Sequence, residues 1–358
     1  MERHKRKING MKHISSFLLD NIIKKPKENK GNQIVLFWST YDKNVDTDYN
    51  TWINKKINIS AFHLLSLLSH TKLDNNTTLY TYQEFNKGQV PKGIIIKDAN
   101  NIFCSKQVYK SLSIGHSIAH ISDVVRLKVA ADIRGIVMDM DAVVLRSLPE
   151  QDSWFASMPA KLSGGVAPKW STSHPPLHIN DNSWNGKALA SFPIKIDDYI
   201  KDKIYILSDK IIKTLKEQPK KNSKAWNYIL WGVKKLMSVN KKSKVFKPIY
   251  FCALPAWLPK GNCYSLESPT RLDGKTKLFG HTLPSIDDIL KRSYVVQHFF
   301  ESSAHMQGGF GVTSESNKDN TSFFKRLPDD CLLANEAKFV IGSQWREVLT
   351  QREKNNKL

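Results

Sequence analysis

Two carboxylates interrupt an apolar segment near the middle of the chain. Ile136-Val137-Met138 precedes Asp139-Met140-Asp141, and a second apolar run, Ala142-Val143-Val144-Leu145, follows. If the backbone stays extended, the two carboxylates fall on the same side, because successive side chains of a strand alternate. Two unpaired like charges at a buried sheet edge are costly. A divalent cation would relieve that cost, and oxygen ligands suit Mg²⁺ or Mn²⁺.

The residues before this acid pair predict a helix that ends shortly before the strand. Ser122 is a good N-cap, and Asp123 suits the positive end of a helix. Gly135 is a plausible stop just past the end. Apolar positions spaced by three and four give the helix one apolar face: Val124, Leu127 and Ala131. This context separates the pair from a second Asp-x-Asp triplet, Asp46-Thr47-Asp48, which lies in a polar segment with no strand before it.

The first hundred residues alternate strand and helix, which predicts an α/β domain with a largely parallel sheet. We expect strands over 33–38, 77–82 and 94–96 and a helix over 59–70. Residues 150–190 look irregular, 195–240 mostly helical, and Tyr294 to Phe300 a short strand. The expected organisation is a basic lead-in over 1–30, a first α/β half over 31–150, a second half of the same domain over 151–345, and a charged tail over 346–358 that is frayed from Arg352.

The chain is strongly basic, with 54 Lys and Arg against 33 Asp and Glu and a formal charge of +21. Residues 195–250 hold 15 lysines against five acidic residues, with Trp226, Tyr228 and Trp231 among them. Such a stretch can bind polyanions and stack its aromatics on exposed bases. It is equally the solvated face of a lysine-rich helix whose aromatics lie in the core. Lysine is poorly suited to reading bases, so charge alone identifies no partner.

The sequence shows few features of a membrane-spanning, secreted or disulfide-bonded protein. No segment approaches 18 uninterrupted apolar residues, which excludes a transmembrane helix. The apolar piece Ile14 to Leu19 is too short and polar for a secretory signal. Four widely spread cysteines without a CxxC pair argue against a zinc cage or a disulfide framework. We therefore expect a cytoplasmic protein, with peripheral contact to an anionic membrane left open.

The segment from Ser122 to Leu148 resembles the signature of the DXD-containing sugar-transferase family. That family includes initiating mannosyltransferases, α1,4-galactosyltransferases and bacterial surface-polysaccharide enzymes. The matching polar residues are Ser122, Asp123, Arg126, Asp139 and Asp141. The chain departs from the pattern at Arg134, where a Gly is usual, and at Met138, where an aromatic residue or Leu is usual. The strand from Ile34 to Trp38 resembles the family's opening strand, without its histidine.

This resemblance implies a fold and an activity. The fold would be GT-A-like, a Rossmann-type mixed sheet flanked by helices, with irregular and helical additions in the C-terminal half. The activity would be metal-dependent transfer of a sugar from a nucleotide diphosphate sugar, with retention of configuration. The cofactor would be Mn²⁺ or Mg²⁺, and the acceptor a glycan or glycoconjugate, as in polysaccharide biosynthesis.

The resemblance also assigns roles to the polar residues of the signature. The acid pair would lie at the carboxyl end of a strand, where open α/β sheets bind ligands. Asp141 would contact the metal directly, and Asp139 through water or at the nucleotide ribose. The metal would stabilise the departing diphosphate. Asp123 would accept hydrogen bonds from sugar hydroxyls, and Arg126 would pair with Asp123 or with the diphosphate. A chance loop, a helix-cap acid and a surface ion pair remain the plainer interpretations.

Further contacts follow from the same resemblance. A third metal ligand often comes from a late histidine, for which His298 is the first choice and His305 the next. Asn182, in the loop 181–186, would lie beside the donor sugar. Phe37-Trp38-Ser39 would lie near the base and ribose. A structural histidine and an ordinary turn are the plainer interpretations of His298 and of 181–186.

Three other functions remain open at this point. The acceptor could be a modified base in viral DNA, which the enzyme would have to reach or flip. The chain could instead be a non-catalytic polyanion-binding protein on a transferase fold, although such a protein has no need of the acid pair. A metal-dependent nuclease or phosphatase usually needs more converging acids than the sequence offers.

Overall fold

The structure of the chain is a computed structural model. The structure describes residues 33–73, 75–151, 153–159, 187–233, 235–236, 243–251, 253–254, 272–278, 281–298 and 323–356. The predicted lead-in over 1–30, Asn182 and His305 lie outside these residues. The side chains of Trp226 and Trp231 are likewise outside the description.

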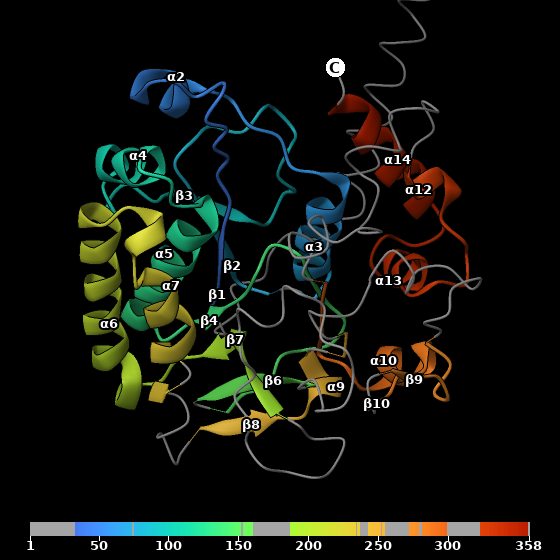
Figure 1. The fold of residues 1–358 in the computed structure, drawn as a ribbon. Coiled ribbons are helices and arrows are strands. Elements are labelled where there is room, and N and C mark those ends of the chain that lie inside the picture. Colours follow the sequence, from blue (N-terminus) through green and yellow to red (C-terminus); the bar gives the residue numbers. More distant parts are fainter. Residues whose placement is uncertain are drawn as a thin grey trace, which may run out of the picture.

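A seven-stranded mixed sheet forms the centre of the molecule (Figure 1), in the order β3-β2-β1-β4-β7-β6-β8. Its strands are β1 (Ile34–Phe37), β2 (Thr77–Thr81), β3 (Ile95–Asp98), β4 (Ile136–Val137), β6 (Trp154–Pro159), β7 (Lys187–Lys195) and β8 (Lys244–Phe246). The first four strands are parallel to one another. β7 runs antiparallel to both β4 and β6, and β8 is parallel to β6. The three strands expected in the first hundred residues are confirmed, whereas β6 and β7 lie in a region expected to be irregular.

The other strands among the described residues form two small sheets: β5 (Ala142–Val144) with β11 (Val295–Gln297), and β9 (Lys277–Leu278) with β10 (His281–Thr282). Both pairs are antiparallel. The expectation of a single extended strand through the acid pair is wrong, because β4 and β5 belong to different sheets. The chain turns between them, and the turn is closed by a hydrogen bond from the Ala142 N–H to the Asp139 carbonyl, 3.3 Å.

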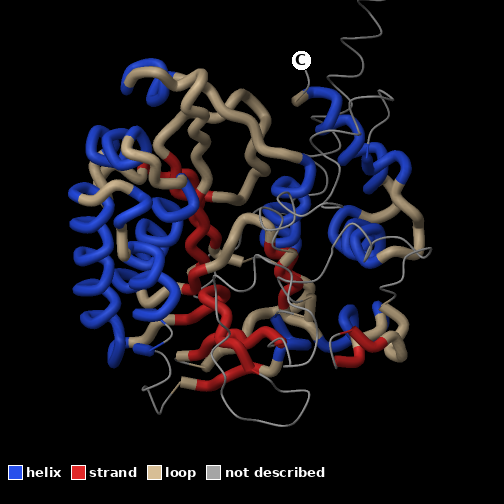
Figure 2. The backbone as a smooth tube through the Cα atoms, in the orientation of Figure 1, coloured by secondary structure: helices blue, strands red, loops and turns tan. Residues whose placement is uncertain are grey.

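Helices cover both faces of the central sheet, as Figure 2 shows in blue against the red strands. Helices α4, α5, α6 and α7 lie on one side, and α3, α12, α13 and α14 on the other (Figure 1). The helices are α2 (Tyr49–Asn54), α3 (Ala61–Lys72), α4 (Ser105–Ser113), α5 (Ile118–Ile133), α6 (Asp198–Glu217), α7 (Ala225–Asn227), α9 (Pro248–Phe251), α10 (Ile286–Arg292), α12 (Phe323–Arg326), α13 (Leu332–Ile341) and α14 (Trp345–Asn355), with short turns η2 (Lys220–Asn222) and η3 (Tyr228–Gly232). The predicted α/β class, a mixed sheet flanked by helices with helical additions in the C-terminal half, is confirmed.

The continuous apolar run of β1 follows from burial on both faces, as is usual for parallel strands. Ile34 and Leu36 belong to the core cluster on the α3 and α13 side. Val35 and Phe37 belong to the cluster on the α5 and α6 side. Alternate residues of one strand thus supply two separate cores.

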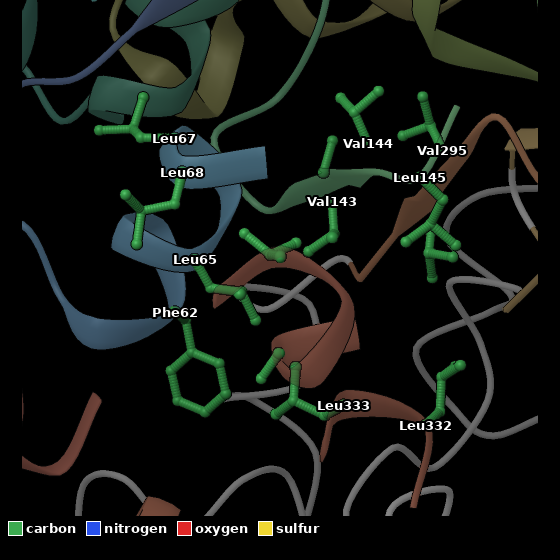
Figure 3. Close-up of a cluster of buried hydrophobic side chains, with 14 of the residues drawn as sticks. Phe62, Leu65, Leu67, Leu68, Val143, Val144, Leu145, Val295, Leu332 and Leu333 are labelled. Carbon is green, nitrogen blue, oxygen red and sulfur yellow. The ribbon is translucent and has the colours of Figure 1, made fainter. Parts of the chain in front are cut away.

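The core between α3, β5 and α13 holds the segment that follows the acid pair (Figure 3). Side chains from these elements and from β11 meet there: Phe62, Leu65 and Leu68 of α3, Val143 and Val144 of β5, Leu332 and Leu333 of α13, and Val295 of β11. The helix expected over 59–70 is confirmed, and its apolar spacing faces this core. β5 is therefore anchored on one side by α3 and on another by β11.

Helix α5 begins earlier than the sequence indicated. Its N-cap is Ser117, whose side chain accepts a hydrogen bond from the His120 N–H, so Ser122 lies inside the helix. The left-handed residue at its end is Arg134, with φ 53°, and not Gly135. Gly135 is required for a different reason: a Cβ there would lie 2.8 Å from the Gln33 carbonyl oxygen.

The expected frayed tail is instead helix α14. Trp345, Val348 and Leu349 are buried on its inner face. Arg352 is only 6% exposed, and its guanidinium donates to the Gly88 carbonyl at 2.9 Å. Burial lowers the pKa of Arg352 to about 10. The segment is charged in overall composition, but its buried apolar residues pack this helix against the rest of the protein.

The basic segment forms an amphipathic helix, α6. Its apolar residues, including Ile200, Ile204 and Ile211, are fully buried, while Lys203, Lys210 and Lys213 are exposed. The interpretation as a solvated lysine face over a core stripe fits these residues. No helix in the part of the chain described here has the length and apolar content to cross a membrane. Cys104 and Cys331 are free thiols.

Candidate active site

The carboxyl ends of β1, β2 and β4 meet at one edge of the sheet, because these strands are parallel neighbours. The segments after β1 and β2 are fastened together there. The Tyr82 N–H donates to the Ser39 hydroxyl at 2.9 Å, and the Thr40 N–H donates to Gln83 Oε1 at 2.9 Å. The acid pair follows β4 at this same edge.

Asp139 and Asp141 occupy a turn, and their carboxylates converge on one amide. Gln297 Nε2 donates to Asp139 Oδ2 at 3.3 Å and also to Asp141 Oδ1. The Asp139 side chain is 31% exposed. A turn thus brings the two acids together, where the sequence suggested an extended strand.

Helix α3 fixes the residues that leave this turn. Ser66 donates its hydroxyl proton to the Ala142 carbonyl at 2.7 Å, and the Val144 N–H donates to the Ser69 hydroxyl at 2.9 Å. Both serines are fully buried. Their hydrogen bonds explain why polar side chains occur on a buried helix face.

Arg126 of α5 joins two of the predicted acids. Its Nη1 lies 2.6 Å from Asp139 Oδ1, and its Nη2 lies 2.8 Å from Asp123 Oδ1. Nη1 also donates to the Met138 carbonyl. The side chain is 3% exposed, so this is a buried ion-pair network and not a surface pair. Pairing with Asp123 was one of the two partners expected for Arg126.

The electrostatics of this network favour a cation. Burial acts to lower the pKa of the Arg126 guanidinium, but Asp139 and Asp123 outweigh it, so the pKa is raised above its ordinary value. Arg126 therefore stays charged. The carboxylates of Asp139 and Asp141 converge beside this ion pair, and a divalent cation between them would reduce their mutual repulsion.

His298 lies beside the turn, but its side chain is engaged elsewhere. Its backbone N–H donates to the Asp141 carbonyl at 3.1 Å, which continues the β5–β11 pairing. Its Nε2 lies 2.8 Å from Glu336 Oε2 of α13, and both side chains are fully buried. Metal coordination by His298 would have to use Nδ1, and this role stays a prediction.

Sequence reasoning missed Gln297 and Glu336. Neighbouring side chains of a strand point to opposite faces, so the structure directs Gln297 toward the acids and His298 toward Glu336 of α13. No motif marks either residue. The alternation of side chains within 294–298 indicates which residue faces the acids, but only once the pairing with β5 is known.

The three residues expected near a base and ribose differ in position. Phe37 is 4% exposed and packs edge-on against Tyr82, with ring centroids 5.8 Å apart. That core position does not present the ring to a ligand. Ser39 is buried and joins the β1 and β2 ends through Tyr82.

Trp38 is the partly exposed member of this group. Its Nε1 donates to the Asn58 carbonyl at 3.2 Å, and its ring lies 4.2 Å from that of His63. Burial lowers the pKa of His63 to about 4, so the imidazole beside Trp38 is neutral at pH 7.

The donor set at the turn fits a hard divalent cation. The carboxylates of Asp139 and Asp141 and the amide of Gln297 offer oxygen atoms, which Mg²⁺ and Mn²⁺ prefer. Gln297 Oε1 is buried without a hydrogen-bond partner among the described residues. In the same part of the chain, no group of three or more His, Cys, Asp and Glu side chains is placed to hold a metal.

Comparisons with known proteins give little beyond this geometry. No family model matches the chain, and no curated protein matches it. Among solved structures, the chain is similar to one described as PaToxG Glycosyltransferase, with 15% identity and a TM-score of 0.32. The match covers 66% of this chain and 80% of that one. A likeness this distant assigns no activity to the chain.

Proposed function

We propose that the chain is a metal-dependent glycosyltransferase of the GT-A type, using a nucleotide diphosphate sugar as donor. The observation that supports this most is the convergence of Asp139 and Asp141 on one point after β4. The position at the carboxyl end of a parallel strand is where open α/β sheets bind nucleotides. The resemblance of 122–148 to the DXD signature agrees with this placement.

The two acids are proposed to act differently. Asp139 pairs through Oδ1 with Arg126 and directs Oδ2 to the Gln297 amide. Asp141 directs Oδ1 to the same amide. In this proposal Asp141 is the direct ligand, and Asp139 acts through water or at the ribose. The bound metal would offset the charge of the departing diphosphate. Without it, phosphates facing these acids would be repelled by several kcal/mol.

Asp123 and Arg126 have different roles in this proposal. The buried guanidinium holds Asp139 and Asp123 in place, so Arg126 is a positioning residue and does not touch the diphosphate. The Asp123 side chain is 12% exposed, and its carboxylate would accept hydrogen bonds from donor-sugar hydroxyls. The proposed acceptor is a glycan or glycoconjugate, with retention of anomeric configuration.

A second acceptor class is favoured by one feature of α6. Tyr199 and Tyr205 are exposed at 52% and 38%, and lysines lie over both rings: Lys203 at 4.9 Å and Lys128 at 4.6 Å. A polyanionic acceptor, including DNA with modified bases, would contact such a face. Its transfer rate would fall steeply with added salt, whereas transfer to a neutral glycan would not.

The decisive experiment is donor hydrolysis in the presence of Mn²⁺. The protein would be incubated with a panel of nucleotide diphosphate sugars, and release of free nucleoside diphosphate measured for the parent chain, Asp141→Asn and Asp48→Asn. We expect metal-dependent release that is lost in Asp141→Asn and kept in Asp48→Asn. Release that needs neither the metal nor Asp141 would reject the mechanism.

A further inference from the structure

We propose that Gln297 is the third protein ligand of the metal, through its side-chain oxygen Oε1. This inference rests on the proposed function, because it concerns the same site. It names a residue that neither the Asp-x-Asp signature nor the choice of a late histidine includes.

The position of Gln297 is set by the sheet and not by a flexible loop. The residue ends β11 and pairs with Ala142, the first residue of β5 after the acids. It is fully buried. Its amide nitrogen reaches both carboxylates at once, Asp139 at 3.3 Å and Asp141 in closer contact. The Gln297 side chain therefore lies where the two carboxylates converge.

The other half of this amide is unsatisfied. Oε1 of Gln297 has no hydrogen-bond partner within the described residues, although it is buried. A buried carbonyl oxygen without a partner is unfavourable. In a second arrangement of the same side chain, Oε1 would have a cation as its partner, and the amide N–H groups would take the position that Oε1 held.

A half-turn of the terminal amide supplies this second arrangement. The last torsion of glutamine is broad and close to two-fold, so exchanging nitrogen and oxygen costs little and leaves the shape nearly unchanged. With the nitrogen facing inward, its N–H groups stabilise the two carboxylates. With a divalent cation between the acids, those N–H groups would be repelled and the oxygen would be attracted. The amide thus suits the turn with or without a bound cation.

Gln297 is better placed than His298 for this role. Successive residues of β11 face opposite ways, and the imidazole Nε2 is held at 2.8 Å by Glu336 on the far side. An amide oxygen with two carboxylates makes an all-oxygen donor set. Such a set favours Mg²⁺ and Mn²⁺ over Zn²⁺, which imidazole would favour.

Calorimetric titration of the full chain with Mn²⁺ alone tests the assignment. We expect Gln297→Leu to weaken Mn²⁺ binding about tenfold or more and Gln297→Glu, which keeps an oxygen at the site, to bind at least as tightly as the parent. The matched control is Gln89→Leu, which removes another buried glutamine, whose Oε1 accepts from the Ile59 N–H at 2.8 Å. It should leave Mn²⁺ affinity unchanged. Thermal melting of each variant shows whether it is folded.

Mn²⁺ electron spin-echo spectroscopy provides a second measurement that does not depend on activity. We expect no directly coordinated nitrogen in the spectrum of the parent chain. A coordinated-nitrogen signal that disappears in His298→Ala would overturn the proposal in favour of imidazole.

The two proposals fail in different ways. If Asp141→Asn abolishes Mn²⁺ binding while folded Gln297→Leu binds like the parent, the metal site stands and the Gln297 assignment is wrong. If Gln297→Glu binds more weakly than Gln297→Leu, the assignment is also wrong. If Asp141→Asn binds Mn²⁺ like the parent, the acid pair is not the metal site and both proposals are rejected.

Discussion

The chain contains two Asp-x-Asp triplets, and the structure uses them in opposite ways. In Asp46-Thr47-Asp48, each acid has its own partner. Both Asp46 oxygens lie 3.0 Å from Lys55 Nζ. Asp48 caps α2, accepting from the Thr51 N–H at 2.9 Å and the Thr51 hydroxyl at 2.6 Å.

In Asp139-Met140-Asp141, the acids share their partners. Both carboxylates meet at the Gln297 amide, and one of them also binds Arg126, which serves Asp123 too. Identical spacing therefore gives two acids with separate partners in one place and two converging carboxylates in the other. The proposed cation site therefore depends on the convergence of the carboxylates and not on the triplet itself.

The largest expected effect comes from removing the Arg126 guanidinium, which pairs with Asp139 of the second triplet and with Asp123. Arg126→Met should lower the free energy of unfolding by about 3–5 kcal/mol, because it removes the buried guanidinium that pairs with Asp139 and Asp123. Urea denaturation measures this change. The control is Arg134→Met, whose ion pair with Asp198 is solvent-exposed and should change stability by about 0.5 kcal/mol or less. Equal stability of Arg126→Met and the parent would show that the guanidinium does not hold the acids together.

The second-largest expected effect is stabilisation by added metal, which should depend on the second triplet and not on the first. At a Mn²⁺ concentration about 100 times the dissociation constant, binding should stabilise the parent by about 2.7 kcal/mol. We expect a higher melting temperature with Mn²⁺, reversed by a chelator, in the parent and in Asp48→Asn, and no rise in Asp141→Asn. A rise that persists in Asp141→Asn would assign metal binding to another part of the chain.

The third effect concerns the neutralised acid of the first triplet. Asp46 is fully buried and accepts from the Asp42 N–H at 2.7 Å as well as from Lys55. Asp46→Asn should cost about 1–3 kcal/mol of stability, through loss of charged hydrogen bonds. Mn²⁺ affinity measured on the same variant should equal that of the parent. A weaker affinity would contradict the separation of the two triplets.

The elements that could be predicted from the sequence are those whose signal is local. β1, β2 and α3 followed from an apolar run or from helical spacing, since each is buried in a way its own residues reveal. The start of α5 was misplaced because Ser117 and Ser122 are both acceptable N-caps. Tertiary packing selects between them.

The candidate site was predictable to a similar extent. Asp139 and Asp141 stand out because acids are costly in an apolar run, and the family signature points to Asp123 and Arg126. Gln297 could not be found this way. It lies 156 positions from Asp141 in the chain, and only the register of β11 against β5 brings it there. Helix α14 was missed for a related reason: its buried stripe matters only against the rest of the fold.

The smallest effect is expected at the capping acid of the first triplet. Hydrogen bonds from the Thr51 side chain and backbone hold the pKa of the Asp48 carboxyl below its ordinary value. A group with a lowered folded pKa stabilises the fold above its unfolded pKa, about 3.9, and loses that contribution as the pH falls through the folded pKa. Asp48→Ala should therefore be less stable than the parent by the same amount at pH 8 and pH 5. This deficit should be smaller than that of Asp46→Asn and should narrow below about pH 4. Urea titrations at each pH measure it, and a deficit that changes between pH 8 and pH 5 would mean that Asp48 is coupled to a second titrating group, contrary to its independence from Asp46.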